Sequence, residues 1–360
     1  MKAILILSDN IYLTPYISVY TEIMNKLNIS YDIIFWDKNE VEKLNNYNYY
    51  RFFYRSNNKF SKILGYIKFK SFVIKILKNN KYDIVIPLHM PIYLILGRYI
   101  IRNYKDRYIF DVRDYSYEKF LYFKKIETKL VNNSMINIIS SDGYKKFLPL
   151  AQYFNMHNVS MQNYEKYKQY NNSKIPIQIS YIGLIRFMEQ NKKIINFFKN
   201  DSRFHLNFIG TNANNLEEYC KEMNVENVTL IDTFPPQQTL DFYKKTDLIM
   251  NLYGNNTPLL EFALSNKLYY SALLYKPILV CNDTYMSNIT QKYNLGFTLL
   301  LKDKGELDEL FSYIINLNRH EYIESCDSFI ENVNIENDKT IKEISNRILK
   351  IKENVVKKND

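Results

Sequence analysis

Acidic and basic side chains gather directly after a strand-like run in the first half of the chain. The segment "IFDVRDYSYE" places Asp111, Arg113 and Asp114 close together. A carboxylate at a strand end can act as a general base that takes the proton of a hydroxyl group; Asp114 is our first choice and Asp111 the second. The alternative is an internal Asp–Arg pair that caps the next helix. His89, which ends "IVIPLH", is a third candidate, although a lone histidine is more often structural.

Cationic side chains follow a glycine and a strand-like run in the second half of the chain. The segment "ISYIGLIRFMEQNKK" contains Gly183, Arg186 and Lys192. Arginine, lysine and backbone N–H groups can together hold a diphosphate without a metal ion. Glycine lets the backbone approach a phosphate closely. The alternative is that Arg186 is only a surface charge.

Strand-like apolar runs alternate with helix-like segments along the whole chain, and these elements must position the candidate residues. The runs are 3–7, 31–36, 82–88, 107–112 and 136–140, and then 177–183, 204–210, 228–232, 247–253, 276–281 and 296–301. Such alternation predicts parallel sheets with helices on both faces. The expected fold class is therefore α/β, with two Rossmann-like doubly wound domains in tandem. Ligands of this architecture bind beside the carboxyl ends of the strands.

A polar segment rich in tyrosine and asparagine separates the two sets of strands. We predict a linker at 161–176, between a first domain at 1–160 and a second domain at 177–335. Residues 336–360 are a predicted C-terminal amphipathic helix. A chain of 360 residues is long enough for two domains with cores of their own.

Several general signals limit the compartment and the chemistry. The three cysteines lie far apart without a C-x-x-C pair, which favours a reducing compartment. The first ten residues read as a buried strand rather than a signal peptide, and the most apolar stretch, 84–97, is too short to span a bilayer. No phosphate loop of the G-x-x-x-x-G-K-[ST] type and no G-x-G-x-x-G occurs, which disfavours kinases and ordinary dehydrogenases. We expect a cytoplasmic protein without a transmembrane helix.

The positive charge lies in the first half of the chain. Residues 1–164 hold 24 Lys and Arg against 13 Asp and Glu, whereas the net charge of the whole chain is +10. Residues 43–82 contain ten basic side chains and no acidic one, with aromatic and aliphatic residues between them. This pattern fits a surface that lies against anionic lipid headgroups. A solvated helix packed on a sheet is an equal alternative, and no nucleic-acid-binding motif accompanies the charge.

Three segments of the second half resemble the GT-B glycosyltransferases, in particular the bacterial enzymes that build capsule, O-antigen and related surface polysaccharides. Residues 179–198 look like the first strand, turn and helix of that family's donor domain. Residues 230–253 are similar to the helix and strand that face the donor, and 264–283 resemble the segment that holds the donor's ribose and phosphates. The chain has no Asp-x-Asp pair, which the other large glycosyltransferase fold uses to bind a metal, so the resemblance implies a metal-independent reaction.

The resemblance also implies which residues would bind the nucleotide sugar. Gly183, Arg186 and Lys192 would lie at the diphosphate, together with Asn266 and Lys267 at the start of a helix. Many relatives bind the ribose through the second of two glutamates. Tyr270 occupies that place in this sequence, and Glu261 is the nearest carboxylate. A tyrosine hydroxyl cannot accept hydrogen bonds from two ribose hydroxyls as a carboxylate does, so we expect altered ribose contacts.

The sequence thus predicts a glycosyltransferase without a cofactor. Its donor would be a nucleotide sugar, with a UDP-sugar as first choice, and its acceptor a surface polysaccharide carried on a polyprenyl diphosphate at the inner face of the cell membrane. If the reaction inverts the anomeric centre, Asp114, Asp111 or His89 would supply the base; if it retains configuration, all three become binding residues. The alternatives are a sugar-nucleotide 2-epimerase of the same fold and a non-catalytic subunit of a polysaccharide assembly complex.

Overall fold

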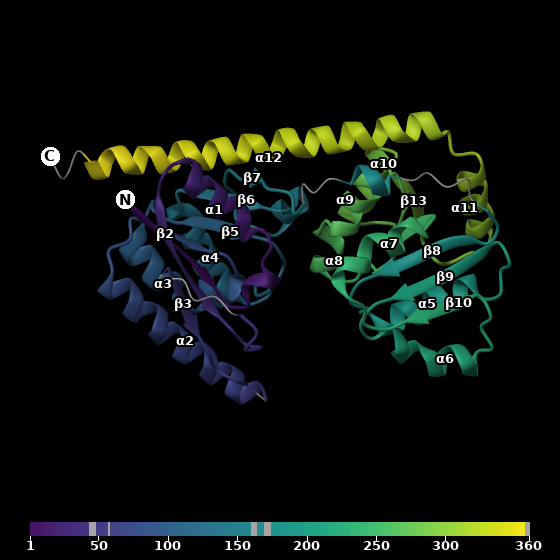
Figure 1. Cartoon of the computed structure of the whole chain (residues 1–360), viewed down its shortest axis with the longest axis horizontal. Coiled ribbons are helices and arrows are strands. Elements are labelled where there is room, and N and C mark those ends of the chain that lie inside the picture. The colour runs from purple at the N-terminus through teal and green to yellow at the C-terminus, as the bar shows by residue number, and fades with distance from the viewer. Residues whose placement is uncertain (43–47, 57, 160–163, 169–173, 357–360) are drawn as a thin grey trace. The chain divides into compact units, whose positions relative to one another are not determined.

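The structure of the protein is a computed structural model. It describes residues 1–42, 48–56, 58–159, 164–168 and 174–356. Within these ranges, parallel strands alternate with helices in both halves of the chain (Figure 1), which confirms the predicted α/β fold class. In the described part of the chain, no helix is both long and apolar enough to cross a membrane.

The chain divides into two compact units. Unit 1 comprises Met1–Asn158 together with Ile335–Asp360, and unit 2 comprises Val159–Asn334. This division falls close to the predicted end of the first domain at residue 160. Most of the predicted linker, 161–176, lies outside the described residues.

The C-terminal helix differs from its prediction. Helix α12 spans Arg319–Val356, so it begins well before the predicted start at residue 336. Side chains from its first part, including Phe329, pack in the core of unit 2, whereas Ile344 and Ile348 pack in the core of unit 1. The prediction assigned the residues before 336 to the second domain. Their apolar side chains do pack in the core of unit 2, but they belong to the same continuous helix as the residues that follow.

Unit 1 is built on parallel strands in the order β3-β2-β1-β4, continued by β5-β6-β7 through a bridge between Val85 and Tyr108. The strands are β1 Lys2–Leu7, β2 Ser30–Trp36, β3 Tyr49–Phe52, β4 Ile84–Pro87, β5 Ile109–Val112, β6 Ile136–Ile139 and β7 Phe154–Asn155. The helices are α1 Ile17–Lys26, α2 Lys59–Asn79, α3 Met90–Tyr104 and α4 Leu121–Asn133. All five predicted strands are present. Strands β3 and β7 were not predicted, because neither is a continuous apolar run.

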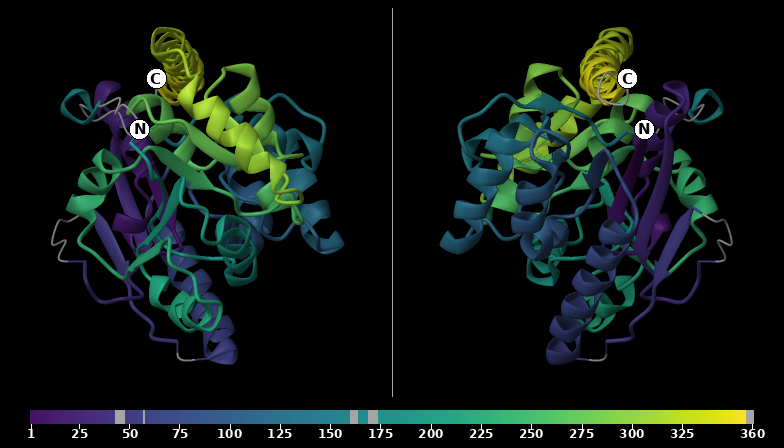
Figure 2. Two further views of the ribbon diagram at one scale, coloured as in Figure 1. Left: turned by 90° about the vertical axis from the view of Figure 1, so that its right-hand side faces the viewer. Right: turned by 90° about the vertical axis from the view of Figure 1, so that its left-hand side faces the viewer.

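Helices α2, α3 and α4 cover one face of the unit 1 sheet. They connect β3 to β4, β4 to β5 and β5 to β6, and each connection runs in the same direction across the sheet, so right-handed crossovers place them on one side. Helix α2 comes close to β2 because Gly65 has no side chain; a Cβ there would lie 2.5 Å from the Trp36 ring. Figure 2 shows α2 beside the purple strands of this unit.

Unit 2 is a six-stranded parallel sheet in the order β10-β9-β8-β11-β12-β13, which is the doubly wound order of the Rossmann fold. Its strands are β8 Ile177–Ile182, β9 Phe204–Ile209, β10 Val228–Ile231, β11 Leu248–Asn251, β12 Ile278–Cys281 and β13 Gly296–Leu299. Its helices are α5 Met188–Phe198, α6 Glu217–Glu222, α7 Thr239–Lys244, α8 Pro258–Phe262, α9 Asn266–Leu273, α10 Tyr285–Lys292 and α11 Gly305–Ile315. The order of the strands reverses between β8 and β11, and a crevice at such a point is where ligands bind.

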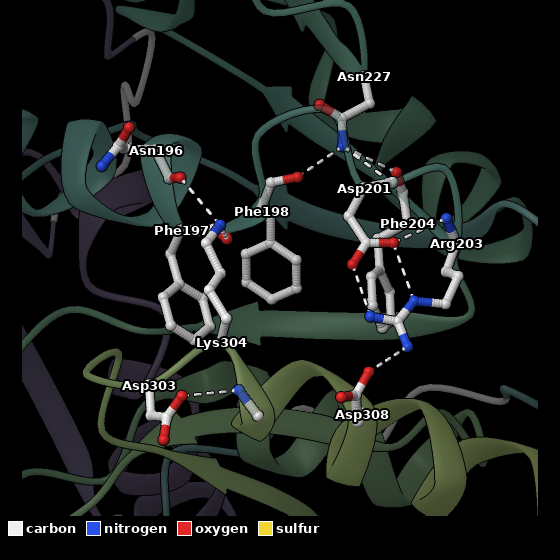
Figure 3. A network of polar contacts seen from close by, with 11 residues as sticks. Asn196, Phe197, Phe198, Asp201, Arg203, Phe204, Asn227, Asp303, Lys304 and Asp308 are labelled. Carbon is white, nitrogen blue, oxygen red and sulfur yellow. Dashed lines mark hydrogen bonds and ion pairs between the residues drawn. The ribbon is translucent and has the colours of Figure 1, made fainter.

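A polar network holds the end of α5 and the start of β9 in place (Figure 3). The Asn227 side chain donates hydrogen bonds to the carbonyl oxygens of Phe198, Asp201 and Phe204, at 2.8, 3.3 and 3.0 Å. The Arg203 guanidinium binds Asp201 at 2.7 Å and Asp308 of α11 at 2.6 Å. The network therefore joins the turn after α5 to α11.

We expect Asn227→Ala to lower the free energy of unfolding by about 1–3 kcal/mol, because three carbonyl oxygens each lose one hydrogen bond and the Asn200 N–H loses its acceptor. Urea denaturation followed by circular dichroism measures this loss. Asn316→Ala is the matched control, since the Asn316 amide bonds only to Ser312 within one exposed turn. Equal stabilities of the two variants would contradict the prediction.

Candidate functional site

The carboxyl ends of β8 and β11 bring together residues that are distant in the sequence. Gly183 follows β8, Tyr253 lies just beyond β11, and Lys267 stands at the start of α9. The Lys267 ammonium nitrogen donates a hydrogen bond to the Tyr253 hydroxyl at 2.7 Å. A Cβ added to Gly183 would lie 3.9 Å from the same nitrogen. The ammonium group therefore lies over the backbone of the turn that follows β8.

The turn after β8 has a backbone shape that few side chains allow. Gly183 has φ +122°, and its N–H donates to the Ile209 carbonyl at 2.9 Å. The turn ends at Phe187, which has φ +59° immediately before α5. The buried Asn191 side chain donates to the Arg186 carbonyl at 2.7 Å, and the Arg186 N–H donates to the Tyr181 hydroxyl at 3.2 Å. These bonds hold the backbone of Arg186, while its side chain is exposed.

Lys267 carries an ammonium group that is almost completely buried. Only 8% of the residue is exposed, and its nitrogen lies 4.7 Å from the centre of the Tyr181 ring. In the part of the chain that the structure describes, Lys267 forms no ion pair with a carboxylate. Burial lowers the pKa of Lys267 to about 8; Tyr181 acts in the opposite direction, and the Arg186 charge lowers the pKa further.

A site of this kind favours an anion. An ammonium group taken out of water without a counterion is costly, and an anion placed against it removes most of that cost. The amino end of a helix also favours an anion, and the Ser265 side chain caps α9 at this end by accepting from the Lys267 N–H at 3.2 Å. Gly183, Arg186 and Lys267 were predicted together as phosphate-binding residues, and the structure brings their backbone and charges to one place.

Lys192 does not join this group. Its ammonium pairs with Glu189 one turn earlier on α5, at 3.0 Å, and lies 5.6 Å from the Tyr219 ring centre. It therefore faces Tyr219 near α6 rather than the turn at Gly183. The resemblance implied that Lys192 would lie at the diphosphate, but in the structure its ammonium lies beside Glu189 and Tyr219.

The other predicted donor residues lie on or beside α9. Asn266 is its first residue and is exposed, and Glu261 is partly exposed on α8. The Tyr270 ring stacks on Tyr243 with centroids 5.0 Å apart, and burial raises the pKa of Tyr270 to about 12. Its ring packs among tyrosines, and a ribose contact from it stays a prediction.

Sequence reasoning missed two tyrosines that line the site. Tyr181 and Tyr253 have ring centroids 5.3 Å apart and both contact the Lys267 ammonium. Phe187 extends this aromatic wall, with its centroid 5.4 Å from that of Tyr253. Their place in the sequence could have indicated this role, because Tyr181 lies near the end of β8 and Tyr253 just after β11. These are the two strands between which the strand order reverses.

In unit 1, His89 is held as a neutral ring. It follows β4, and its Nδ1 accepts from the Ser8 backbone N–H at 3.1 Å, which leaves the proton on Nε2 facing the Thr14 hydroxyl at 3.1 Å. Burial lowers the pKa of His89 to about 4, with Asp9 acting in the opposite direction. A ring with its lone pair already bonded is poorly suited to remove a proton, so this geometry favours a structural role over the predicted catalytic one.

Asp111 is likewise occupied inside unit 1. The side chain is 1% exposed and accepts from the Tyr20 hydroxyl at 2.7 Å. Arg113 approaches both carboxylate oxygens, at 2.8 and 2.9 Å, and also donates to the Met156 carbonyl at 2.8 Å. The internal Asp–Arg pair is thus the arrangement found, although it caps no helix. Asp114 is exposed on the loop after β5 and stays the candidate base.

A second charged pair at the carboxyl edge of unit 1 was not predicted. Asp9 follows β1, and its carboxylate binds Lys38, which follows β2, at 2.8 Å. Both side chains are partly exposed. They lie beside the reversal between β1 and β4, where the order of strands in this sheet changes direction.

Two carboxyl groups near Asp114 in the sequence are fully buried: Glu118, in the segment between β5 and α4, and Glu127, on α4. Within the described structure, neither oxygen of Glu127 has a hydrogen-bond partner, and burial raises its pKa from 4.5 to about 8, with Glu118 adding to the effect. The folded protein therefore holds this proton at pH values where the unfolded chain has lost it. Stability then falls as the pH rises from 4.5 to about 8.

Glu127→Gln is expected to remove this loss, because the amide does not titrate. Near pH 8 the variant should be more stable than the native protein by about 2–4 kcal/mol, and the difference should shrink as the pH approaches 5. Urea denaturation at several pH values measures both curves. Glu222→Gln, at an exposed position of α6, serves as the control. Parallel curves for native protein and Glu127→Gln would contradict the raised pKa.

Comparison of the sequence with protein-family models and with curated proteins yields no match. The fold, however, is similar to solved structures. The sucrose-phosphate synthase from Thermosynechococcus elongatus has a TM-score of 0.70 at 8% identity, covering 99% of each chain. The lipopolysaccharide outer core galactosyltransferase WaaB has a TM-score of 0.65 at 14% identity, covering 97% of this chain and 99% of its own. HepE from Anabaena, in complex with UDP, has a TM-score of 0.66 at 11% identity, covering 96% and 100%.

These structures share one architecture over nearly their whole length. The chain has the GT-B fold of two Rossmann-like domains, as predicted from the alternation of strands and helices. The identities are low, so the likeness establishes the fold, and the activity must be argued from the site.

Proposed function

We propose that this protein is a glycosyltransferase that uses a nucleotide sugar as donor, with a UDP-sugar as first choice. The observation that carries the proposal is the buried Lys267 ammonium, which has no acidic partner in the described structure and stands beside Gly183 and Arg186 at the strand reversal of unit 2. Two structures of the same fold support the choice of donor: HepE is in complex with UDP, and WaaB is described as a galactosyltransferase.

The residues of this site suit a diphosphate leaving group. Breaking the bond between the sugar and the diphosphate increases the negative charge on the leaving oxygen, and fixed cations that neutralise this charge lower the barrier. Lys267 and Arg186 would supply the positive charge, and the backbone after Gly183 would approach the phosphates closely. With two cations present, we propose that the transfer needs no metal ion. The aromatic wall of Tyr181 and Tyr253 would keep water away from the ammonium group.

The acceptor side of the proposal rests on unit 1. We propose a surface polysaccharide carried on a polyprenyl diphosphate, and Asp114 as the base if the reaction inverts the anomeric centre. Support comes from the basic first half of the chain and from WaaB, which is named for the lipopolysaccharide outer core. The proposed location is the inner face of the cell membrane, as a peripheral protein.

The decisive experiment is a binding screen of UDP-, GDP-, dTDP- and CMP-sugars by thermal shift and saturation-transfer NMR. We expect one donor class to bind the native protein and to bind Arg186→Ala at least tenfold more weakly. Lys193→Ala is the control, since Lys193 is exposed on the same helix. Transfer of the sugar to a lipid-linked acceptor would then support the full reaction. Conversion of the free UDP-sugar without an acceptor would identify an epimerase, and the absence of any binding would favour the non-catalytic subunit.

A further inference from the structure

The outward face of the first half of α2 is apolar. Its side chains recur at the spacing of one helix face, and several are strongly exposed, with Phe60 at 79% and Ile63 at 60%. The four residues of this stripe are Phe60, Ile63, Leu64 and Ile67. The opposite face of α2 is the one that packs on the sheet, where Phe69 stacks on Trp36. The stripe is therefore not part of the core.

Basic side chains flank the stripe. Lys59 and Lys70 lie to one side of it and Lys68 to the other, given the rotation of an α-helix. The next acidic residue along the chain after Glu42 is Asp83. In the described residues, no lysine of α2 forms an ion pair with a carboxylate. Within the described structure, the positive charge of this helix is thus not neutralised by a carboxylate.

A second exposed apolar group occurs at the start of α4. Phe120, Leu121 and Tyr122 are exposed, Leu121 at 78%, and Lys119 and Lys124 stand on either side of them. The two carboxyl groups nearest to this segment in the sequence are those of Glu118, just before it, and Glu127, one turn after it. Both are buried and do not face solvent. The two segments therefore share one composition, which is exposed apolar side chains among lysines, and none of these lysines has an ion pair in the part of the chain that the structure describes.

The two segments lie on the same face and at the same edge of unit 1. Helices α2 and α4 both start at the carboxyl ends of strands, and α3, which lies on the same side of the sheet, contacts both. The Arg98 guanidinium of α3 lies 5.5 Å from the centre of the Tyr122 ring.

We propose that this surface, here called the α2–α4 face and made of residues 59–70 and 119–125, binds the surface of an anionic lipid bilayer. The apolar side chains enter the interface between headgroups and acyl chains, and the lysines contact the phosphates. A second copy of the chain is a poor occupant, since pairing this face with itself would bring two clusters of lysines together. An anionic bilayer as partner agrees with the proposed function, in which the acceptor is linked to a lipid. Binding through the α2–α4 face would bring the carboxyl edge of unit 1 close to that lipid-linked acceptor.

Cosedimentation of the full chain with vesicles tests the proposal. We expect binding to vesicles of phosphatidylcholine mixed with phosphatidylglycerol, weak binding to phosphatidylcholine alone, and weakening by salt. Ile63→Ser/Leu121→Ser should bind the mixed vesicles at least tenfold more weakly, and Lys59→Gln/Lys70→Gln should lose most of the dependence on phosphatidylglycerol. The controls are Leu150→Ser, at a fully exposed leucine elsewhere in unit 1, and Lys302→Gln in unit 2; both should bind as the native protein does.

Two results would overturn the proposal. Equal vesicle binding by the native protein and Ile63→Ser/Leu121→Ser would show that another surface meets the lipid. A native dimer in light scattering that dissociates in the same variant, without vesicle binding, would assign the face to a second copy. Donor binding measured in parallel separates this proposal from the proposed function: the variants of the α2–α4 face should keep it, and its absence in the native protein would contradict the enzyme but not the membrane contact.

Discussion

Lys267→Met is expected to weaken the binding of the UDP-sugar by about 100-fold. Methionine keeps most of the length and the apolar stem of lysine but removes the charge and its hydrogen bonds, and charge-assisted bonds to a phosphate in a buried site are worth about 1.5–3 kcal/mol each. The folded protein itself should be as stable as the native one or more so, because a buried ammonium without an acidic partner is costly. Isothermal titration calorimetry and thermal melts measure the two effects.

The pH dependence of binding provides a second readout of the same residue. The free protein holds Lys267 with a pKa of about 8, so a diphosphate, which prefers the ammonium, should bind with constant affinity below that pH. Above it, affinity should fall by up to about tenfold per pH unit. The stability of the free protein should rise over the same range, since the unfolded chain then binds more protons than the folded one.

Lys193→Met is the matched control for this prediction, because Lys193 is exposed on α5. It should leave both the affinity and the pH profile unchanged. In Lys267→Met the decline above pH 8 should be absent. A Lys267→Met protein that binds the donor as tightly as the native chain would show that the diphosphate lies elsewhere, and the proposed donor site would be wrong.

Gly210→Ala is expected to lower the free energy of unfolding by about 3–5 kcal/mol. Gly210 has φ +137°, which side chains rarely adopt, and a Cβ there would lie 1.9 Å from the Gly183 carbonyl oxygen. Relief requires the two strand ends to separate, since the clash is with backbone. Because Gly183 belongs to the candidate donor site, any folded Gly210→Ala protein should also bind the UDP-sugar more weakly.

Gly305→Ala is the control for this substitution. Gly305 begins α11, and the nearest atom to an added Cβ is 3.6 Å away on Asp303, which is an ordinary contact. Urea denaturation should place Gly305→Ala within about 0.5 kcal/mol of the native protein. A Gly210→Ala protein of native stability and native affinity would mean that β8 and β9 do not approach each other as closely as the structure shows.

The sequence by itself determined the class of fold and supplied three residues of the candidate donor site. Parallel strands that are buried on both faces read as nearly continuous apolar runs, so strands such as β1 and β12 stand out as local patterns that need no knowledge of their neighbours. Gly183, Arg186 and Lys267 were proposed because their segments resemble the donor domain of the GT-B glycosyltransferases, and each of them follows a strand or begins a helix.

Only the tertiary structure decided which charged groups are available. Asp111 and Lys192 looked suitable in sequence, yet Tyr20 and Arg113 occupy the first, and the rotation of α5 turns the second towards Glu189. Conversely, the importance of Tyr253 arises from its contact with Lys267, fourteen residues later in the chain. The physical reason is the same throughout: burial and hydrogen bonding depend on partners from other elements, and local sequence does not specify which elements meet.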